Sequence, residues 1–173
     1  MIKQFSQIIS WGSAVLMLWF PLYGIYFLLD ISRFSASLHE GLRLPIQWQT
    51  VEPWQLYTFL LITFCFWSLA VASLFYLRRA FSAFAAGELF TVENSRSIRV
   101  FAVLVFAQAL TKPLQGAIGS VLLSLNHPDG QRMLSLSLGS DTVQTIGLSM
   151  ILWIVAEILI TAHRLENENQ QFV

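Results

Sequence analysis

Three residues stand out because their side chains could do chemistry inside an apolar environment. Lys112 and Glu157 each interrupt a long apolar run, and Gln108 lies one helical turn before the lysine. A lysine at the centre of a bilayer costs about 2.5 to 3.5 kcal/mol on insertion scales, so such a residue normally faces other helices and has a partner. These are the candidate intramembrane functional residues, since a cation beside an amide could bind a substrate or line an ion path.

The lysine shares one face of a helix with other polar and small residues. Gln108, Lys112, Gln115, Gly116 and Gly119 follow the helical repeat. Small residues on such a face let a neighbouring helix approach closely. Two interpretations of Lys112 stay open. It is either part of a substrate or ion path, or a structural residue that holds helices together or extends toward the membrane surface.

The partner of Glu157 is also open. By helical rise it lies about 8 Å from the end of its apolar run, whereas Lys112 is about 10 Å deeper. A direct pair between the two would require both side chains to extend fully. The alternative is that Glu157 lies near the membrane surface beside Arg99 or Arg164.

The rest of the sequence excludes several classes of chemistry. The single cysteine, Cys65, cannot form an intramolecular disulfide, a redox pair or a thiolate zinc site. The chain has no zinc-protease, phosphate-loop or nucleophile-elbow motif, so we expect no enzyme, no metal and no cofactor. Ten basic and ten acidic residues cancel, which argues against binding to nucleic acid.

Four apolar runs have the length that a bilayer requires. They cover 8–29, 56–77, 100–125 and 143–162, and about 20 helical residues cross the hydrocarbon. The chain is 55% hydrophobic and 12% charged, against about 25% charged in a typical soluble domain. Because backbone groups in hydrocarbon must bond within their own segment, we expect one all-α membrane domain with four transmembrane helices.

The basic residues predict the orientation of these spans. Segments on the side of the termini hold six lysines and arginines, and the two loops on the opposite side hold three. The side richer in basic residues is normally cytoplasmic. Both termini and the loop 78–99 are therefore predicted to be cytoplasmic, and the loops 30–55 and 126–142 external.

The external loops contain patterns of alternating apolar and polar residues. Met133-Leu134-Ser135-Leu136-Ser137-Leu138 alternates with period two, and 42–48 does so more loosely. Such a pattern is typical of short β-strands, which could pair as a cap over the helices. The alternative is an interfacial loop that rests its leucines on the membrane surface.

The cytoplasmic loop has clear helix end signals. Phe81–Ala86 extends the second span as a helix, which Gly87 ends, and Thr91 is an N-cap for the helix that leads into the third span. Glu93 would lie favourably in the first turn of that helix.

This loop carries a resemblance to a known family. Gly87-Glu88-Leu89-Phe90-Thr91-Val92-Glu93-Asn94, followed by Ile98-Arg99, resembles the signature of the DUF2975 family of small four-span bacterial membrane proteins. The C-terminal part from Ala156 is similar to the ending of that family. The resemblance implies a bacterial inner-membrane location and four-span architecture, with Gly87, Phe90, Thr91, Glu93 and Asn94 as motif residues. It implies no activity, because the family has none assigned.

Two functions from different classes follow. The first is a non-enzymatic accessory or regulatory component of the lipid bilayer, which recognises a second copy of the chain or another membrane protein through helix faces and the loop 78–99. The alternative is a small transporter or ion-conducting oligomer that uses Gln108, Lys112 and Gln115 with Glu157.

Overall fold

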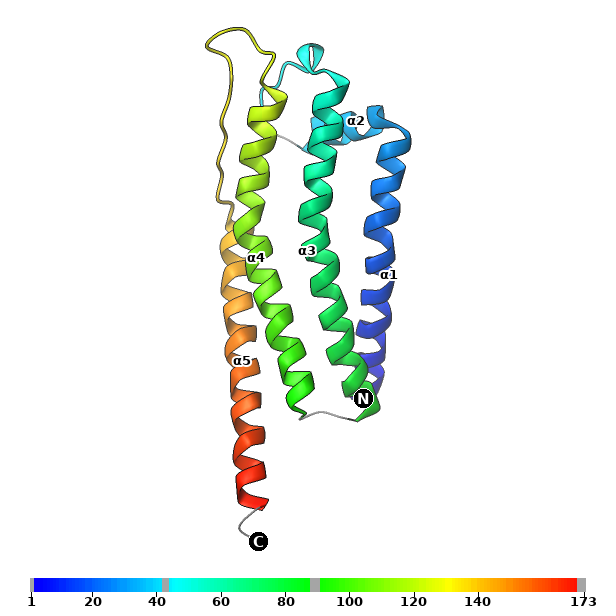
Figure 1. Ribbon diagram of the computed structural model, residues 1–173, viewed down its shortest axis with the longest axis vertical. Coiled ribbons are helices and arrows are strands. Elements are labelled where there is room, and N and C mark those ends of the chain that lie inside the picture. Colours follow the sequence, from blue (N-terminus) through cyan, green and yellow to red (C-terminus); the bar gives the residue numbers. More distant parts are fainter. Residues whose placement is uncertain (1, 42–43, 88–90, 171–173) are drawn as a thin grey trace.

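The computed structural model describes residues 2–41, 44–87 and 91–170 and is all-α (Figure 1). Its elements are α1 (Ile2–Leu29), α2 (Ile31–Gly41), a 3-10 turn (Trp48–Thr50), α3 (Pro53–Ala86), α4 (Val92–Leu123) and α5 (Ser140–Gln170). The four long helices α1, α3, α4 and α5 are long and apolar enough to cross a membrane. The protein is therefore a multi-pass membrane protein, with the expected four spans.

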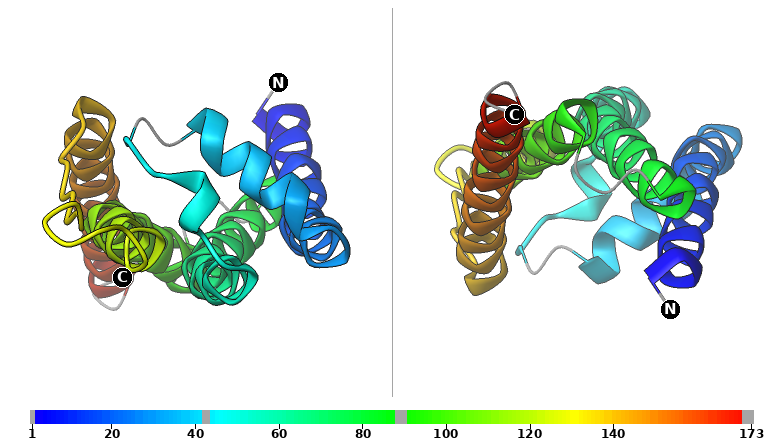
Figure 2. Two further views of the ribbon diagram at one scale, coloured as in Figure 1. Left: turned by 90° about the horizontal axis from the view of Figure 1, so that it is seen from above. Right: turned by 90° about the horizontal axis from the view of Figure 1, so that it is seen from below.

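The long helices stand in a curved row instead of a closed bundle. Among the described residues, α1 packs on α3, α3 on α4 and α4 on α5, while α1 and α5 do not touch. Figure 2 shows this arc, with α2 and the segment after it on the concave side at one end. The first and last described residues lie at the opposite end, which we call the terminal end. The other is the α2 end.

Small residues hold neighbouring long helices together over much of their length. Ser13, Ser73, Ala102, Ala109 and Ala156 are all buried. In a membrane, where lipid is as apolar as leucine, such residues let helices approach closely enough for dispersion contacts. Near the α2 end of the α1–α3 contact, a Cβ added to Gly24 would collide with the Phe64 ring.

The larger apolar residues gather at the α2 end. The buried cluster joins residues from α1, α2, α3, α4 and the segment before the 3-10 turn: Phe27, Phe34, Ile46, Leu56, Phe59, Leu60 and Leu123. The short helix α2, which the sequence analysis did not predict, contributes Phe34 to it. Its start is fixed by Asp30, whose carboxylate accepts from the Ser32 amide at 3.2 Å and pairs with Arg33 at 2.9 Å. The hydrogen bond from the Ser32 hydroxyl lowers the pKa of Asp30.

The predicted helix ends around the 78–99 loop are confirmed. Helix α3 continues to Ala86 and ends at Gly87, whose φ of 98° is a left-handed conformation that glycine adopts most easily. Thr91 is the N-cap of α4 and accepts a hydrogen bond from the Asn94 amide at 3.2 Å. Glu93 lies in the first turn, as expected.

The alternating segment before α5 forms no strand in the part of the chain that the structure describes. Residues 131–139 are extended and run beside α4 (Figure 1). The amides of Met133 and Ser135 donate to the hydroxyls of Ser124 and Ser120, each at 2.9 Å. Two serines one helical turn apart thus take the place of a partner strand, which is why period-two alternation misled the strand prediction.

A buried histidine joins the two loops at the α2 end. His127 is 4% exposed, and its Nε2 accepts the Gln47 amide proton at 3.0 Å. Its Nδ1 lies 3.1 Å from the Gln131 carbonyl and so carries the ring proton in this arrangement. Beside it, the Asn126 side chain donates to the Thr50 carbonyl at 3.3 Å. These bonds fix the connection after α4 onto the segment before α3.

We expect His127→Phe to destabilise the protein, because the phenyl ring keeps the volume but leaves the Gln47 amide without its acceptor. The expected cost is about 1 to 3 kcal/mol. Thermal melting of detergent-purified protein, followed by fluorescence-detected size exclusion, measures it. His39→Phe is the matched control, since His39 is exposed and its ring contact with Trp48 can be kept. Equal melting of the two variants would contradict the role assigned to His127.

Candidate functional site

Lys112 forms an ion pair with Asp141, the second residue of α5. The lysine lies on α4 about 16 Å from the end of that helix at Leu123. Its ammonium donates to the Asp141 carboxylate, and both side chains are more than half exposed in the isolated chain. The sequence analysis weighed Glu157 as the direct partner, and the structure pairs Lys112 with a different acid. The pair is neutral, so it offers neither an unpaired cation nor a free base.

The sequence around Asp141 explains why α5 begins beside Lys112. The Gly139 carbonyl accepts the amide protons of Thr142 and Val143 at 3.0 and 3.3 Å, which starts the helix. A Cβ at Gly139 would collide with the Asp141 carboxylate. An acid in the first turn is also stabilised by the partial positive charge of the helix N-terminus. The helix start and the ion pair therefore support each other.

The two glutamines of the predicted polar face bond to α3. Gln108 Nε2 donates to the Leu69 carbonyl at 3.3 Å, and Gln115 Nε2 donates to the Thr63 hydroxyl at 3.2 Å. Both therefore cross-link neighbouring helices. Of the two glycines on this face, Gly119 is in close contact, since an added Cβ would lie 2.6 Å from the Phe59 ring, whereas Gly116 has open space around it.

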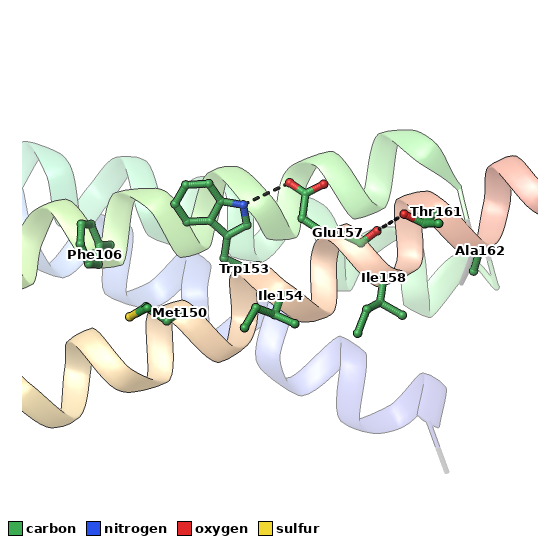
Figure 3. Close-up of a pocket in the computed structure, with 8 residues that line it drawn as sticks. All are labelled: Phe106, Met150, Trp153, Ile154, Glu157, Ile158, Thr161 and Ala162. Carbon is green, nitrogen blue, oxygen red and sulfur yellow. Dashed lines mark hydrogen bonds between the residues drawn. The ribbon is translucent and has the colours of Figure 1, made fainter.

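Glu157 pairs with Arg99, one of the alternatives that the sequence left open. The Arg99 Nε lies 3.0 Å from Glu157 Oε1, and the Trp153 indole donates to the same oxygen at 3.1 Å. Figure 3 shows the indole and the carboxylate turned toward one another along α5. Lys112 and Glu157 therefore belong to two separate ion pairs, which connect the same two helices at different depths.

The family-like motif lies at the turn between α3 and α4. Glu93 accepts from Arg79 of α3 at 2.7 Å, and Asn94 is buried. With Gly87 and Thr91 as helix ends, four of the five motif residues shape this turn. Phe90 lies outside the described residues.

The described residues contain no group of three or more histidines, cysteines or acids placed to hold a metal ion. The polar residues described above make pairs between helices, and none of these pairs combines a nucleophile with a base. Comparison of the chain with protein-family models, with curated proteins and with solved structures gives no match.

Sequence reasoning missed Asp141, Ser120 and Ser124. It placed the start of the last span at Val143, two residues after the acid. The available signal was Gly139-Ser140-Asp141, a glycine and a serine before an acid, which is typical of a helix start. The serines gave no signal of their own, because a hydroxyl in a helix usually bonds to its own backbone.

The Lys112–Asp141 pair predicts a charge-swap result. Lys112→Asp and Asp141→Lys should each lower the melting temperature, because each places two like charges together in an apolar region. The double variant should recover part of the loss, since it restores an opposite pair. Melting of detergent-purified protein measures the coupling. Arg33→Asp with Asp30→Lys, a swap of the local pair at the start of α2, serves as control and should show weaker coupling because it lies outside the apolar runs, where water screens it. Additive effects at 112 and 141 would contradict the pairing.

Proposed function

We propose that this protein is a non-enzymatic integral membrane component, an accessory or regulatory subunit that binds another membrane protein through the connection between α4 and α5. The observation that carries the proposal is the exposure of that connection. Leu134, Leu136 and Leu138 are 74%, 62% and 70% exposed, and no residue in the described ranges accepts a hydrogen bond from their amides.

The depth of this segment makes a protein partner preferable to lipid. Gln55 at the start of α3 donates to the Leu122 carbonyl at 2.6 Å, so the apolar run of α3 begins level with the end of α4. The extended segment descends from that level to Lys112. Irregular backbone is tolerated at membrane depth only where protein covers it or water reaches it. A protein partner that supplies hydrogen-bond acceptors would bond to the amides of Leu134, Leu136 and Leu138.

The direction of the segment favours a different protein over a second copy. The segment runs along the helix axes (Figure 1), so a copy with the same orientation in the membrane would bring its own segment in parallel. A segment of another protein that runs antiparallel to residues 131–139 can pair with them in an antiparallel β-ladder. Such a ladder is slightly more stable per residue than a parallel one. An extended partner segment with alternating apolar side chains fits the leucines best.

The transport alternative has less support. Gln108 and Gln115 each bond to α3, and Lys112 is neutralised by Asp141. Transport would need these side chains to leave their partners. Ion flux into liposomes that contain the purified protein tests this alternative. If Lys112→Gln abolished such a flux and the variant still folded, transport would replace the accessory function as the proposal.

A test of the proposed interface uses the unbonded amide of Leu136. Leu136→Pro removes a backbone N–H that donates to no residue of the described chain, so the variant should still fold. Ser135→Pro removes the amide that bonds to Ser120 and should lower the melting temperature. A photo-crosslinking amino acid at Ser137, in cells with native expression, should give a discrete protein adduct that Leu136→Pro abolishes. Lipid adducts alone, or a protein adduct insensitive to Leu136→Pro, would contradict the interface.

We also propose that the chain lies in a bacterial inner membrane with both termini cytoplasmic, as the basic residues and the resemblance to the DUF2975 family suggest. Single cysteines placed at the exposed residues Ala86 and Asp129, with Cys65 changed to Ser, provide the test. A membrane-impermeant thiol reagent added to intact cells with a permeabilised outer membrane should label position 129 and spare 86. The reverse pattern would overturn the orientation.

A further inference from the structure

His127 holds the connection after α4 through hydrogen bonds that require a neutral imidazole. The residue is buried, and within the described chain its ring bonds only to the Gln47 amide and the Gln131 carbonyl. Because Nε2 accepts from the Gln47 amide at 3.0 Å, this nitrogen carries no proton. A second proton on the ring would place two N–H donors against each other.

The described residues provide no counter-ion for a protonated His127. The charged and titratable side chains of the surrounding elements are Glu52 at the start of α3, His39 and Glu40 at the end of α2, and Asp129 and Arg132 of the same loop. None of these forms an ion pair or a hydrogen bond with the ring in the described chain. The Glu52 carboxylate accepts from Asn126 and Trp54 instead, at 3.2 and 2.8 Å. An imidazolium here would be a buried charge without a partner, which is unfavourable.

The bonds of His127 belong to a cluster of three residues, His127, Gln47 and Gln131, which we call the latch. Gln47 Nε2 donates to Gln131 Oε1 at 2.5 Å, so side chains also bond the two loops directly. Gln131 is the first residue of the extended segment 131–139, and Gln47 follows Ile46, a member of the buried cluster. The latch therefore joins the beginning of the extended segment to the α2 end of the molecule.

We propose that the latch is pH-sensitive: protonation of His127 at Nε2 breaks its bond to the Gln47 amide and separates the connection after α4 from the segment before α3. Histidine side chains normally change charge between about pH 8 and 5, so the latch is closed at the upper end of this range and open at the lower end. The stability that the bond contributes is present while the ring is neutral and is lost as the pH falls. The latch does not depend on the proposed partner, because all of its bonds lie within the chain.

The position of the latch allows the surrounding solution to protonate it. Asn126 and Pro128, the residues on either side of His127, are exposed, so water lies close to the ring. In the orientation proposed above, this loop is on the external side of the membrane. The latch would then respond to the pH outside the cell.

Hydrogen exchange of the detergent-purified full chain, measured by mass spectrometry at about pH 7.5 and 5, tests the latch. Labelling times are scaled for the intrinsic dependence of exchange on pH. After this correction, the peptide that contains Gln47 should exchange about tenfold faster at the lower pH, because the amide has lost its acceptor. A peptide around Ala102, which is buried in α4, is the internal control and should not change.

His127→Gln separates the effect of protonation from the loss of an acceptor. A glutamine side chain carries a carbonyl oxygen about as far from the backbone as Nε2, so it can accept from the Gln47 amide at both pH values. Exchange at Gln47 should then stay slow at the lower pH. His39→Gln and His163→Gln are the matched controls, since neither histidine belongs to the latch, and both should keep the wild-type response.

Each of the other outcomes overturns the proposal. Equal corrected exchange of the Gln47 peptide at the two pH values in the wild type would do so without any variant. A response that persists in His127→Gln would assign the acid sensitivity to another group, such as Glu52. Loss of the response in His39→Gln or His163→Gln would assign it to that histidine. An equal change in the Ala102 peptide would mean a general loss of structure in acid.

Discussion

The ion pair between Lys112 and Asp141 determines where the last helix begins, and much of the architecture follows from it. A lysine that far along an apolar helix needs an acid at its own depth, and Asp141 supplies one because α5 starts there and not at the level where α4 ends. The chain must then cover the distance from Leu123 down to Asp141 without a helix. The extended segment 131–139 exists for that reason, and Ser120 and Ser124 bond to two of its amides.

The two ends of the helix row are stabilised by different forces. At the α2 end, aromatic and aliphatic side chains form a buried cluster, and His127 and its partners bond the loops together. Toward the terminal end, neighbouring helices meet through small residues such as Ala102 and Ala156 and through ion pairs such as Arg99–Glu157. A groove lined by Phe106 of α4 and by residues of α5 that include Met150 and Ile154 lies in this part of the molecule.

The sequence predicted what depends on local composition. Span length and hydropathy located four helices, and the conformational preference of Gly87 and the capping hydroxyl of Thr91 located a turn correctly. The pairing of Lys112 with Asp141 and of His127 with Gln47 could not be predicted, because these partners lie 29 and 80 residues apart in the chain and meet only through the packing of the helices and loops. Helix α2 was missed because its pattern, with Phe34 and Leu38 facing the cluster, is short and lies in a loop rich in polar residues.

The open row leaves the connection between α4 and α5 uncovered by any other long helix of the described chain. The segment 131–139 presents peptide groups, and only another protein or water can satisfy these at membrane depth. Within the described residues α5 contacts no helix except α4, and the segment leads directly into its first turn. A protein partner on this segment would therefore supply to the start of α5 the packing that a closed bundle would otherwise provide.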